Sequence, residues 1–281
     1  MESSSGSATT HRIIITGGTR GIGAGLVRAF AGAGWQVHFS GRSEASVKSA
    51  MEGMPIGLAE RVSGHACAAD DAEGLSRLWD SASREGAVEV VLCNAGISHN
   101  SPRFSDHSPG DLKDVVGTNL LGPMVAAKVL LPRLEAQGGG FFYGMEGYGS
   151  GGQIQAGMTL YGASKYALAY LLRALAVESA GSKVAIGALS PGMVVTDLLL
   201  SGEGGLAGIP RMDEGRKRIF NILADRVETV APWLAARVME DVERGPKPGR
   251  LTRHDWLTTP KILVRFLTAG IAKRSVIEGA S

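Results

Sequence analysis

The feature that most limits the possible folds is a regular alternation of short apolar runs with amphipathic stretches. Runs rich in β-branched and aromatic residues indicate strands, and apolar residues repeated every three or four positions indicate helices. Near-continuous apolar strands separated by helices are typical of a parallel sheet covered on both faces. We predict an α/β fold with a doubly wound parallel sheet in three α/β/α layers. The predicted strands are 11–16, 36–40, 62–67, 88–93, 140–145 and 184–190, and the longest helices are 110–137, broken near Gly117, and 158–180.

The chain is long enough for one substantial core, since it has 281 residues of which 44% are hydrophobic. We expect residues 1–10 to be a flexible N-terminus and residues 11–281 to form a single domain. Beyond the last predicted strand the pattern changes. Residues 198–226 combine a glycine-rich turn with a basic helix, and residues 259–274 show an amphipathic pattern. We expect these two segments to cover a ligand site, as a substrate lid and a C-terminal helix.

Charge and cysteine content exclude several classes of protein. The net charge is only +2 without a basic stripe, which argues against a nucleic-acid partner and leaves a small anionic cofactor open. Cys67 and Cys93 lie in apolar runs without metal-ligand spacing, so we expect no disulfide framework and no metal site. No uninterrupted apolar stretch is of membrane-spanning length. The polar start lacks a signal-peptide core, and a strand from about Arg12 leaves no room for a full transit peptide. If the natural protein is targeted to an organelle, we expect that its targeting segment has been removed from this sequence.

A glycine-rich turn, Thr16–Gly23, joins the first strand to a helix. Its glycines permit a tight turn and let main-chain N–H groups approach a pyrophosphate at the helix N-terminus. Such a turn alone can be an ordinary connection, but a strand before it and a helix after it form the context of a dinucleotide fingerprint. We therefore predict a Rossmann-like cofactor site that includes Gly17, Thr19, Arg20, Gly21, Ile22 and Gly23.

The end of the second strand favours NADPH over NADH as the cofactor. NAD enzymes place an acidic residue here for the ribose hydroxyls. This chain has Gly41 followed by Arg42, with Arg20 in the turn nearby. Two guanidinium groups suit a 2′-phosphate, although they can also be solvated surface residues.

Two further groups of polar residues follow predicted strands. Asn94, Ala95 and Gly96 come directly after the fourth strand, at the carboxyl edge where ligands bind in open α/β sheets. Asp70 and Asp71 follow the third strand and could reach the adenine edge. A helix N-cap is the alternative role for these aspartates.

Tyr161 and Lys165 are four residues apart in a predicted helix, so they share one face. A tyrosine has a reference pKa of about 10, and we expect the neighbouring ammonium to lower it. Tyr161 could then protonate a carbonyl oxygen as hydride reaches the carbon, while Lys165 holds the nicotinamide ribose. The spacing alone usually marks a helix surface. Together with the glycine-rich turn and Asn94–Gly96, it indicates a site for proton and hydride transfer.

These motifs, with Asn119 and Ser190–Gly192, resemble the classical short-chain dehydrogenase/reductase family over roughly residues 11–200. The resemblance implies that Asn119 holds a water for a proton relay to Lys165. It implies a homo-oligomer paired through its long helices. It also implies that the nicotinamide is flanked by Pro191, Gly192, Val194 and Thr196.

The sequence departs from the family at the serine that orients the carbonyl. That serine would fall at position 148, which is Tyr148, and the nearest serine is Ser150 in Gly147–Gly152. We predict that Ser150 is the carbonyl hydrogen-bond donor, with Tyr148 as the alternative; a flexible Gly-Ser loop is the non-catalytic alternative. The adenine-side aspartate is also displaced, which weakens the case for Asp70.

Several segments resemble chlorophyll b reductases, a branch of the same family. The resemblance implies reduction of the C7 formyl group of chlorophyll b by NADPH, giving 7-hydroxymethyl chlorophyll a, in the chloroplast stroma or at the thylakoid surface. Residues 203–215 look like an insertion relative to that branch, so the lid would differ. The segments are 142–152, 190–202, 220–225 and 256–260, with Glu228 and Val230.

The C-terminal helix can be read in two ways. Its apolar face could rest on a membrane surface or a pigment–protein complex, or it could pack on the core or a second subunit. Two other functions also stay open: a generic cytoplasmic carbonyl or 3-oxoacyl reductase, and a non-catalytic NADP-binding sensor, against which the intact tyrosine and lysine count. The apolar face comprises Ile262, Leu263, Phe266, Leu267 and Ile271, and Lys261, Arg265 and Lys273 lie away from it.

Overall fold

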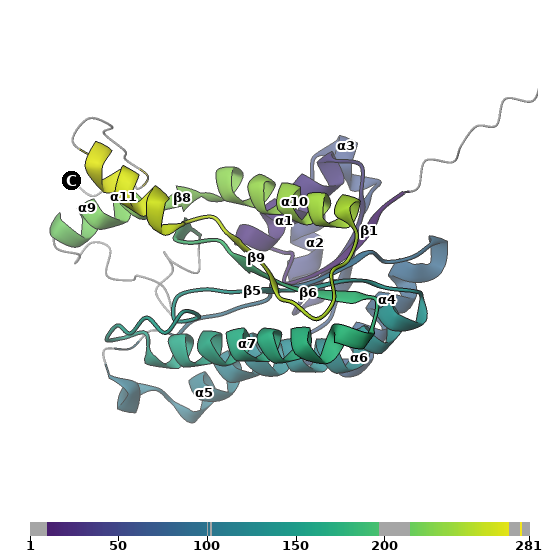
Figure 1. Ribbon diagram of the computed structural model, residues 1–281, viewed down its shortest axis with the longest axis horizontal. Coiled ribbons are helices and arrows are strands. Elements are labelled where there is room, and N and C mark those ends of the chain that lie inside the picture. Colours follow the sequence, from purple (N-terminus) through teal and green to yellow (C-terminus); the bar gives the residue numbers. More distant parts are fainter. Residues whose placement is uncertain (1–9, 100, 102, 197–213, 270–275, 277–281) are drawn as a thin grey trace, which may run out of the picture.

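The computed structural model describes residues 10–99, 101, 103–196, 214–269 and 276 (Figure 1). Seven strands form one parallel sheet in the order β3-β2-β1-β4-β5-β6-β9. This arrangement confirms the predicted Rossmann-like doubly wound sheet. The strands are β1 (Arg12–Thr16), β2 (Gln36–Gly41), β3 (Val62–Ala66), β4 (Val90–Cys93), β5 (Gly140–Met145), β6 (Val184–Ser190) and β9 (Thr252–Asp255).

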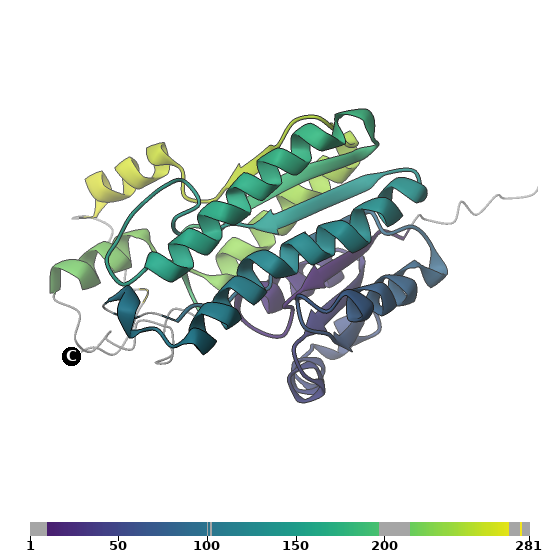
Figure 2. The ribbon, with the colours of Figure 1, turned by 90° about the horizontal axis from the view of Figure 1, so that it is seen from below.

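Helices cover both faces of this sheet (Figures 1 and 2). Successive side chains of a strand point to opposite faces, so Ile13 and Ile15 enter one core and Ile14 enters the other. The first core is completed by α1 (Gly21–Gly32), α2 (Glu44–Glu52) and α10 (Val227–Arg244). The second core is completed by α4 (Ala72–Ala82), α6 (Gly122–Ala136) and α7 (Thr159–Glu178). The short helices α3 (Ile56–Ala59) and α5 (Pro109–Val116) precede β3 and α6.

Most predicted elements are present, and two differences matter for the site. The break expected near Gly117 is a π-helical turn, Gly117–Leu121, between α5 and α6. Turns of this type occur frequently at functional sites. Strand β9 was not predicted, because its sequence Thr-Arg-His-Asp has no apolar alternation.

One helical segment is long and apolar enough, by length and composition, to cross a membrane: Pro109–Ala136, found among the described residues. Four of its side chains, Ala126, Ala127, Leu130 and Leu134, belong to the second core. We therefore interpret this segment as part of the helical layer that packs on one face of the sheet. Cys67 and Cys93 are both free and buried.

The described segments that follow β6 include a second, two-stranded sheet and three helices. Strand β7 (Val194–Val195) pairs with β8 (Asp225–Arg226), and α10 packs along α1. Of the predicted lid, residues 198–213 lie outside the described residues, and the remainder contains α9 (Glu214–Leu223) and β8. Helix α11 (Thr259–Thr268) forms the start of the predicted C-terminal helix. Residues 270–274 of that helix and residues 1–9 also lie outside the described chain.

A histidine pair on neighbouring strands predicts a loss of stability in acid. His38 Nδ1 lies 3.4 Å from His65 Nε2, and burial, with the nearby charges of His65 and Arg12, lowers the pKa of His38 to about 4. In the unfolded chain His38 takes up its proton near pH 6.5. The contribution of neutral His38 to folding stability is therefore fully present above that pH and is lost as the pH falls toward 4. We expect the melting temperature to fall more steeply across this range in the wild type than in His38→Gln. Equal slopes in calorimetry would contradict this.

Candidate active site

The glycine-rich turn lies at the topological switch point between β1 and β4, where open α/β sheets bind ligands. Thr16 Oγ1 accepts hydrogen bonds from the main-chain N–H groups of Asn94 and Ala95, both at 3.2 Å. Asn94 Nδ2 donates to the carbonyls of Thr16 at 3.2 Å and Gly17 at 2.9 Å. The side chain of Asn94, predicted to contact the cofactor, therefore holds the turn in shape.

Three glycines of the turn occupy places where a side chain would not fit. Gly17 and Gly21 have positive φ angles of 68° and 54°. A Cβ on Gly17 would lie 2.6 Å from the Cα of Ala95, and a Cβ on Gly23 would overlap the carbonyl oxygen of Gly17. The glycines thus bring the main chain of the turn directly against the N-terminus of α1.

The residues at the end of β2 are compatible with a 2′-phosphate. Arg20 occupies the N-cap of α1, and Arg42 follows β2; both are exposed. Gly41 cannot carry an acidic side chain, because its Cβ would overlap the methyl group of Thr19. Of the two aspartates, Asp71 caps α4 by accepting from Gly74 N at 2.9 Å, as the alternative reading predicted. Asp70 is exposed.

The hydroxyl of Tyr161 lies against the Cα of Gly147, in the loop that follows β5. A Cβ on Gly147 would overlap this hydroxyl, so a glycine is needed here for the tyrosine to keep its position. Burial raises the pKa of Tyr161 to about 12. The expectation of a lowered pKa is wrong for this structure, because removing the phenolate from water raises the pKa.

Lys165 lies on the same face of α7 as Tyr161 and is 3% exposed. Its Nζ donates to the carbonyl oxygen of Met145 at 2.9 Å and is 5.8 Å from the centre of the Tyr161 ring. Burial lowers the pKa of Lys165 to about 8, and the charge of Glu146 opposes this shift. The ammonium is therefore protonated at neutral pH but loses its proton in mild alkali.

Asn119 is fully buried in the π-helical turn and clamps the loop after β4. Its Oδ1 accepts from Ile97 N at 2.8 Å, and its Nδ2 donates to Ile97 O at 2.9 Å and Ser164 Oγ at 3.1 Å. A Cβ on Gly96 would lie 3.5 Å from both Asn119 Oδ1 and Lys165 Nζ. The structure thus brings Asn119 Oδ1 and Lys165 Nζ close to the same side of Gly96, where a Cβ would stand, while the water relay stays a prediction.

Ser150 is buried and joins the loop after β5 to α7. Its Oγ accepts from Gly147 N at 3.2 Å and donates to the carbonyl oxygen of Lys165 at 3.3 Å. A hydroxyl has one proton, so it must leave Lys165 O in order to donate to a substrate. Tyr148, the alternative donor, is 37% exposed.

Replacing Ser150 with alanine separates these two candidates. We expect Ser150→Ala to lower turnover about tenfold, a typical effect of one lost hydrogen bond to a charged group, and to leave NADPH affinity nearly intact. Steady-state kinetics and a binding titration measure the two quantities. Unchanged turnover would shift the donor role to Tyr148, with Tyr148→Phe as the matched variant.

The residues after β6 approach the glycine-rich turn at the carboxyl edge of the sheet. Gly192 has a φ of 69°, and its Cβ would lie 2.7 Å from Leu257 Cβ. The methyl group of Thr196 lies 3.4 Å from the position of a Cβ on Gly21. Pro191 and Val194 are buried, and the Val194 side chain belongs to the first core, so only its main chain can face a cofactor.

Sequence reasoning missed four residues that shape this site: Thr16, Met145, Glu146 and Gly147. Thr16 ends the predicted first strand and begins the turn motif, but the sequence indicates no hydrogen-bonding role for it. The other three follow one another at the end of β5, where a glutamate directly after an apolar strand was the available signal. Glu146 is 2% exposed and pairs with Arg253 of β9.

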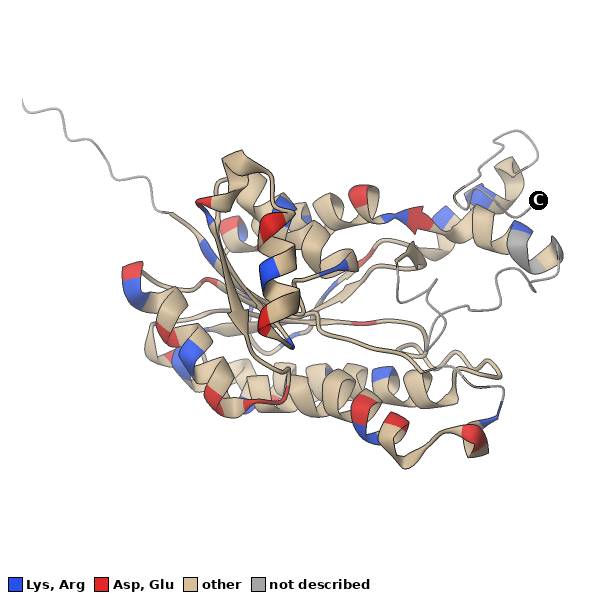
Figure 3. Cartoon of the chain, turned by 180° about the vertical axis from the view of Figure 1, so that it is seen from behind, with Lys and Arg blue, Asp and Glu red and all other residues tan. Residues whose placement is uncertain are grey.

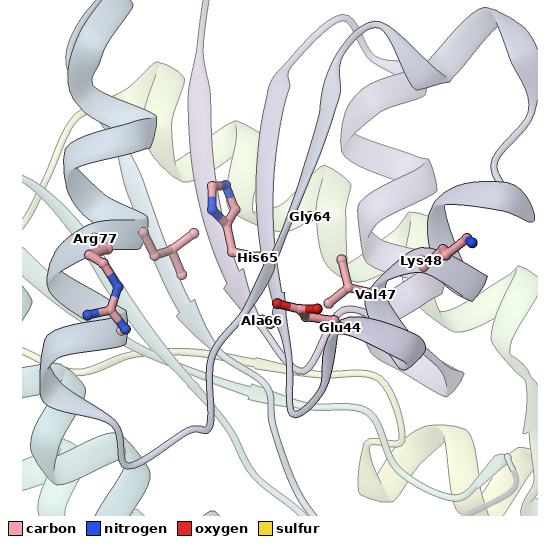
Figure 4. A pocket seen from close by; sticks show the side chains of 9 residues that line it. Glu44, Val47, Lys48, Gly64, His65, Ala66 and Arg77 are labelled. Atoms are coloured by element: carbon pink, nitrogen blue, oxygen red, sulfur yellow. The ribbon is translucent and has the colours of Figure 1, made fainter.

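An open groove lies apart from this site, along the outer edge of β3 between α2 and α4 (Figure 4). Its walls include Lys48, His65 and Arg77, and none of the predicted site residues lines it.

In the described part of the chain, no three His, Cys, Asp or Glu side chains gather as metal ligands. Charges of both signs are interspersed over the helices seen in Figure 3.

Known proteins match most of this chain. It is 31% identical over 284 residues to the protein named "Probable chlorophyll(ide) b reductase NYC1, chloroplastic" of Oryza sativa subsp. japonica. This alignment covers 95% of this chain and 53% of that protein. It is 31% identical over 234 residues to "Chlorophyll(ide) b reductase NOL, chloroplastic" of Arabidopsis thaliana, covering 81% of this chain and 65% of that protein. An L-fucose dehydrogenase of Rattus norvegicus is 32% identical over 66% of this chain and 67% of its own length. The chain spans about half the length of the NYC1 proteins it matches.

The fold is also that of solved structures. A 3-ketoacyl-(acyl-carrier-protein) reductase from Brucella melitensis complexed with NADH aligns with a TM-score of 0.72 at 21% identity, over 87% of this chain and 96% of that chain. ElxO with NADP bound aligns with a TM-score of 0.71 at 22% identity, over 88% and 98%. Residues 11–202 match the family described as short chain dehydrogenase. The chain therefore belongs to the short-chain dehydrogenase family, as the resemblance of its motifs implied.

Proposed function

We propose that this protein is an NADPH-dependent carbonyl reductase that acts on the C7 formyl group of chlorophyll b. The observation that carries the proposal is the convergence of the Tyr161 hydroxyl and the Lys165 ammonium on the end of β5 and the loop that follows it. The glycine-rich turn lies at the same carboxyl edge of the sheet.

The residues present fit a dinucleotide. Arg20 occupies the N-cap of α1 without a side-chain capping hydrogen bond, and no acidic residue lies in the first turn. The N–H groups and positive dipole end of this helix are therefore suited to a pyrophosphate. Arg20 and Arg42 would hold the 2′-phosphate, and Lys165 would hold the nicotinamide ribose. Bound NADPH would supply the hydride.

Tyr161 would supply the proton. With a pKa of about 12, its hydroxyl is protonated at neutral pH and can donate to a carbonyl oxygen beside it. The negative charge then left on the phenolate faces the nearby Lys165 ammonium, which stabilises it. Asn119 keeps the loop after β4 in place next to this ammonium.

Coverage favours chlorophyll b over a generic carbonyl substrate. The match to the NYC1 protein covers 95% of the chain, whereas the match to the L-fucose dehydrogenase covers 66%. A match over 95% of the chain must include most of the segments after β6, which would surround a substrate. The resemblance to the chlorophyll b reductase branch therefore extends beyond the cofactor half of the fold.

The direct test mixes the purified protein with NADPH and chlorophyll b and follows the absorption spectrum. We expect the formyl absorption to disappear together with that of NADPH, in equal molar amounts. A 3-oxoacyl thioester serves as the comparison substrate. Turnover of the thioester without turnover of chlorophyll b would favour the generic reductase.

Helix α11 supports a lipid-facing position for this site, because its orientation is the reverse of that in an ordinary surface helix. Its basic residues face the protein: Arg265 pairs with Asp225 at 2.7 Å and donates to Leu223 O, and Lys261 Nζ lies 3.0 Å from the centre of the Trp256 ring. No residue of α11 is buried. Packing of the apolar face on the core, one of the two predicted alternatives, is thus wrong for the described part. The exposed apolar side chains are Leu263, Val264, Phe266 and Leu267.

We propose that this face lies on the surface of the membrane that holds the pigment. The helix begins two residues after Leu257, which contacts Gly192 at the predicted nicotinamide site, so a membrane contact would bring the site to the lipid surface. The chloroplast, named for the plant relatives, is the proposed location. A homo-oligomer paired through the long helices is likewise proposed.

Vesicle flotation tests the membrane contact. We expect the protein to float with phosphatidylcholine–phosphatidylglycerol vesicles, and the double variant Leu263→Ser/Leu267→Ser to bind about tenfold less, because it removes two apolar side chains from the contact. Ile56→Ser is the matched control, since Ile56 is 93% exposed on α3. Equal flotation of both variants would contradict a role for α11.

A further inference from the structure

The buried carboxylate of Glu146 has no assigned role in the proposed chemistry, although it lies between the two groups that perform it. Its neighbour on one side, Met145, accepts the hydrogen bond of the Lys165 ammonium. Its neighbour on the other side, Gly147, contacts the Tyr161 hydroxyl. Movement of Glu146 would therefore displace both catalytic groups.

An arginine from β9 holds this carboxylate. Arg253 Nη1 donates to Glu146 Oε1 at 2.9 Å, and Nη2 lies 2.7 Å from Oε2 in an ion pair without hydrogen-bond geometry. Arg253 Nε in turn donates to Asp255. An arginine is always charged, so this pairing favours the anionic form of Glu146 against the burial that raises its pKa. The Glu146 side chain of this ion pair is buried, and Glu146 stands in the loop that carries the site.

We propose that Glu146 is a positioning residue that keeps a negative charge and the Met145 carbonyl beside the Lys165 ammonium. The inference rests on the proposed function, because it assigns Glu146 a role only through Lys165. The titratable groups near Lys165 are Tyr161 on α7 and Glu146 in the loop after β5. The charged groups that act on Glu146 are Arg253 and Asp255 on β9 and Arg173 on α7. The Coulombic effect of Glu146 on Lys165 favours the charged ammonium.

The pH dependence of NADPH binding separates a charge effect from a structural one. If the ammonium binds the ribose, loss of the Glu146 charge should weaken NADPH binding mainly in alkali, because Lys165 then loses its proton at a lower pH. For Glu146→Gln we expect NADPH affinity about fivefold weaker than wild type at about pH 8.5 and within about twofold of it at about pH 6.5. Turnover should show the same alkaline loss. Protein fluorescence during titration with NADPH measures the affinity.

Three further variants complete the design. Arg253→Gln breaks the same ion pair but keeps the Glu146 carboxyl, so its alkaline loss should be smaller than that of Glu146→Gln. The double variant Glu146→Gln/Arg253→Met removes both charges, a change that buried pairs often tolerate, and should reproduce the alkaline loss even if Glu146→Gln alone fails to fold. Glu146→Asp should restore the wild-type profile.

Equal losses of NADPH affinity at both pH values in Glu146→Gln and Arg253→Gln would show that Glu146 has only a structural role and would overturn the inference. In that event the wild type would still bind NADPH, and the proposed function would stand. Failure of the wild type to bind NADPH at either pH would overturn both.

Discussion

Replacing Tyr161 with phenylalanine should reduce turnover about 10²–10⁴-fold, the range expected when a general acid is removed. The hydroxyl lies against Gly147 and is protonated at neutral pH, so the variant loses the proton donor and little else. NADPH affinity should stay within about twofold of wild type, because the predicted ribose contact comes from Lys165. Single-turnover absorption with chlorophyll b and NADPH measures the chemical step.

Tyr166 provides the control for this variant. It lies on the same helix and is 53% exposed, so Tyr166→Phe should keep wild-type turnover. Full activity of Tyr161→Phe would remove the proposed proton donor, and full cellular function without catalysis would favour the NADP-binding sensor.

Replacing Gly23 with alanine should abolish tight cofactor binding. The new methyl group would overlap the carbonyl oxygen of Gly17, which is rigid main chain already bonded to Asn94 Nδ2. The turn must then open, and overpacking of this kind costs about 1–3 kcal/mol, which corresponds to an affinity for NADPH up to about a hundredfold weaker. A binding titration followed by NADPH fluorescence measures the change.

Gly32 offers a matched control at the other end of the same helix. A Cβ at this position meets nothing within 4 Å, so Gly32→Ala should leave affinity unchanged. If Gly23→Ala bound NADPH as tightly as Gly32→Ala, the glycine-rich turn would not be the pyrophosphate site.

The elements that local patterns specify were predicted from the sequence. Residues 140–145 are an apolar run that follows Gly139, and residues 184–190 are one that Pro191 ends. Both strands have the predicted bounds. The glycine-rich turn was found because it stands between a strand and a helix. Tyr161 and Lys165 were placed on one face because helical spacing alone determines that relation.

What the sequence did not predict depends on contacts between distant residues. Strand β9 is polar, and its Arg253 is stabilised by Glu146, more than a hundred positions earlier, so no local pattern indicates a strand. The pKa of Tyr161 depends on burial, which spacing does not specify. Helical spacing predicted that Leu263, Phe266 and Leu267 share one face of α11, and all three are exposed. It did not predict that Lys261 and Arg265 face the protein, because that orientation follows from Asp225 and Trp256.

A crystal structure with NADP bound would test the central claim most directly. We predict that the pyrophosphate lies on the N-terminus of α1 and that C4 of the nicotinamide lies within about 4 Å of the Tyr161 hydroxyl, close enough for proton and hydride to reach one carbonyl group. A nicotinamide ring directed away from Tyr161 and Lys165, with the turn around Gly17–Gly23 free of phosphate, would contradict the proposed reductase.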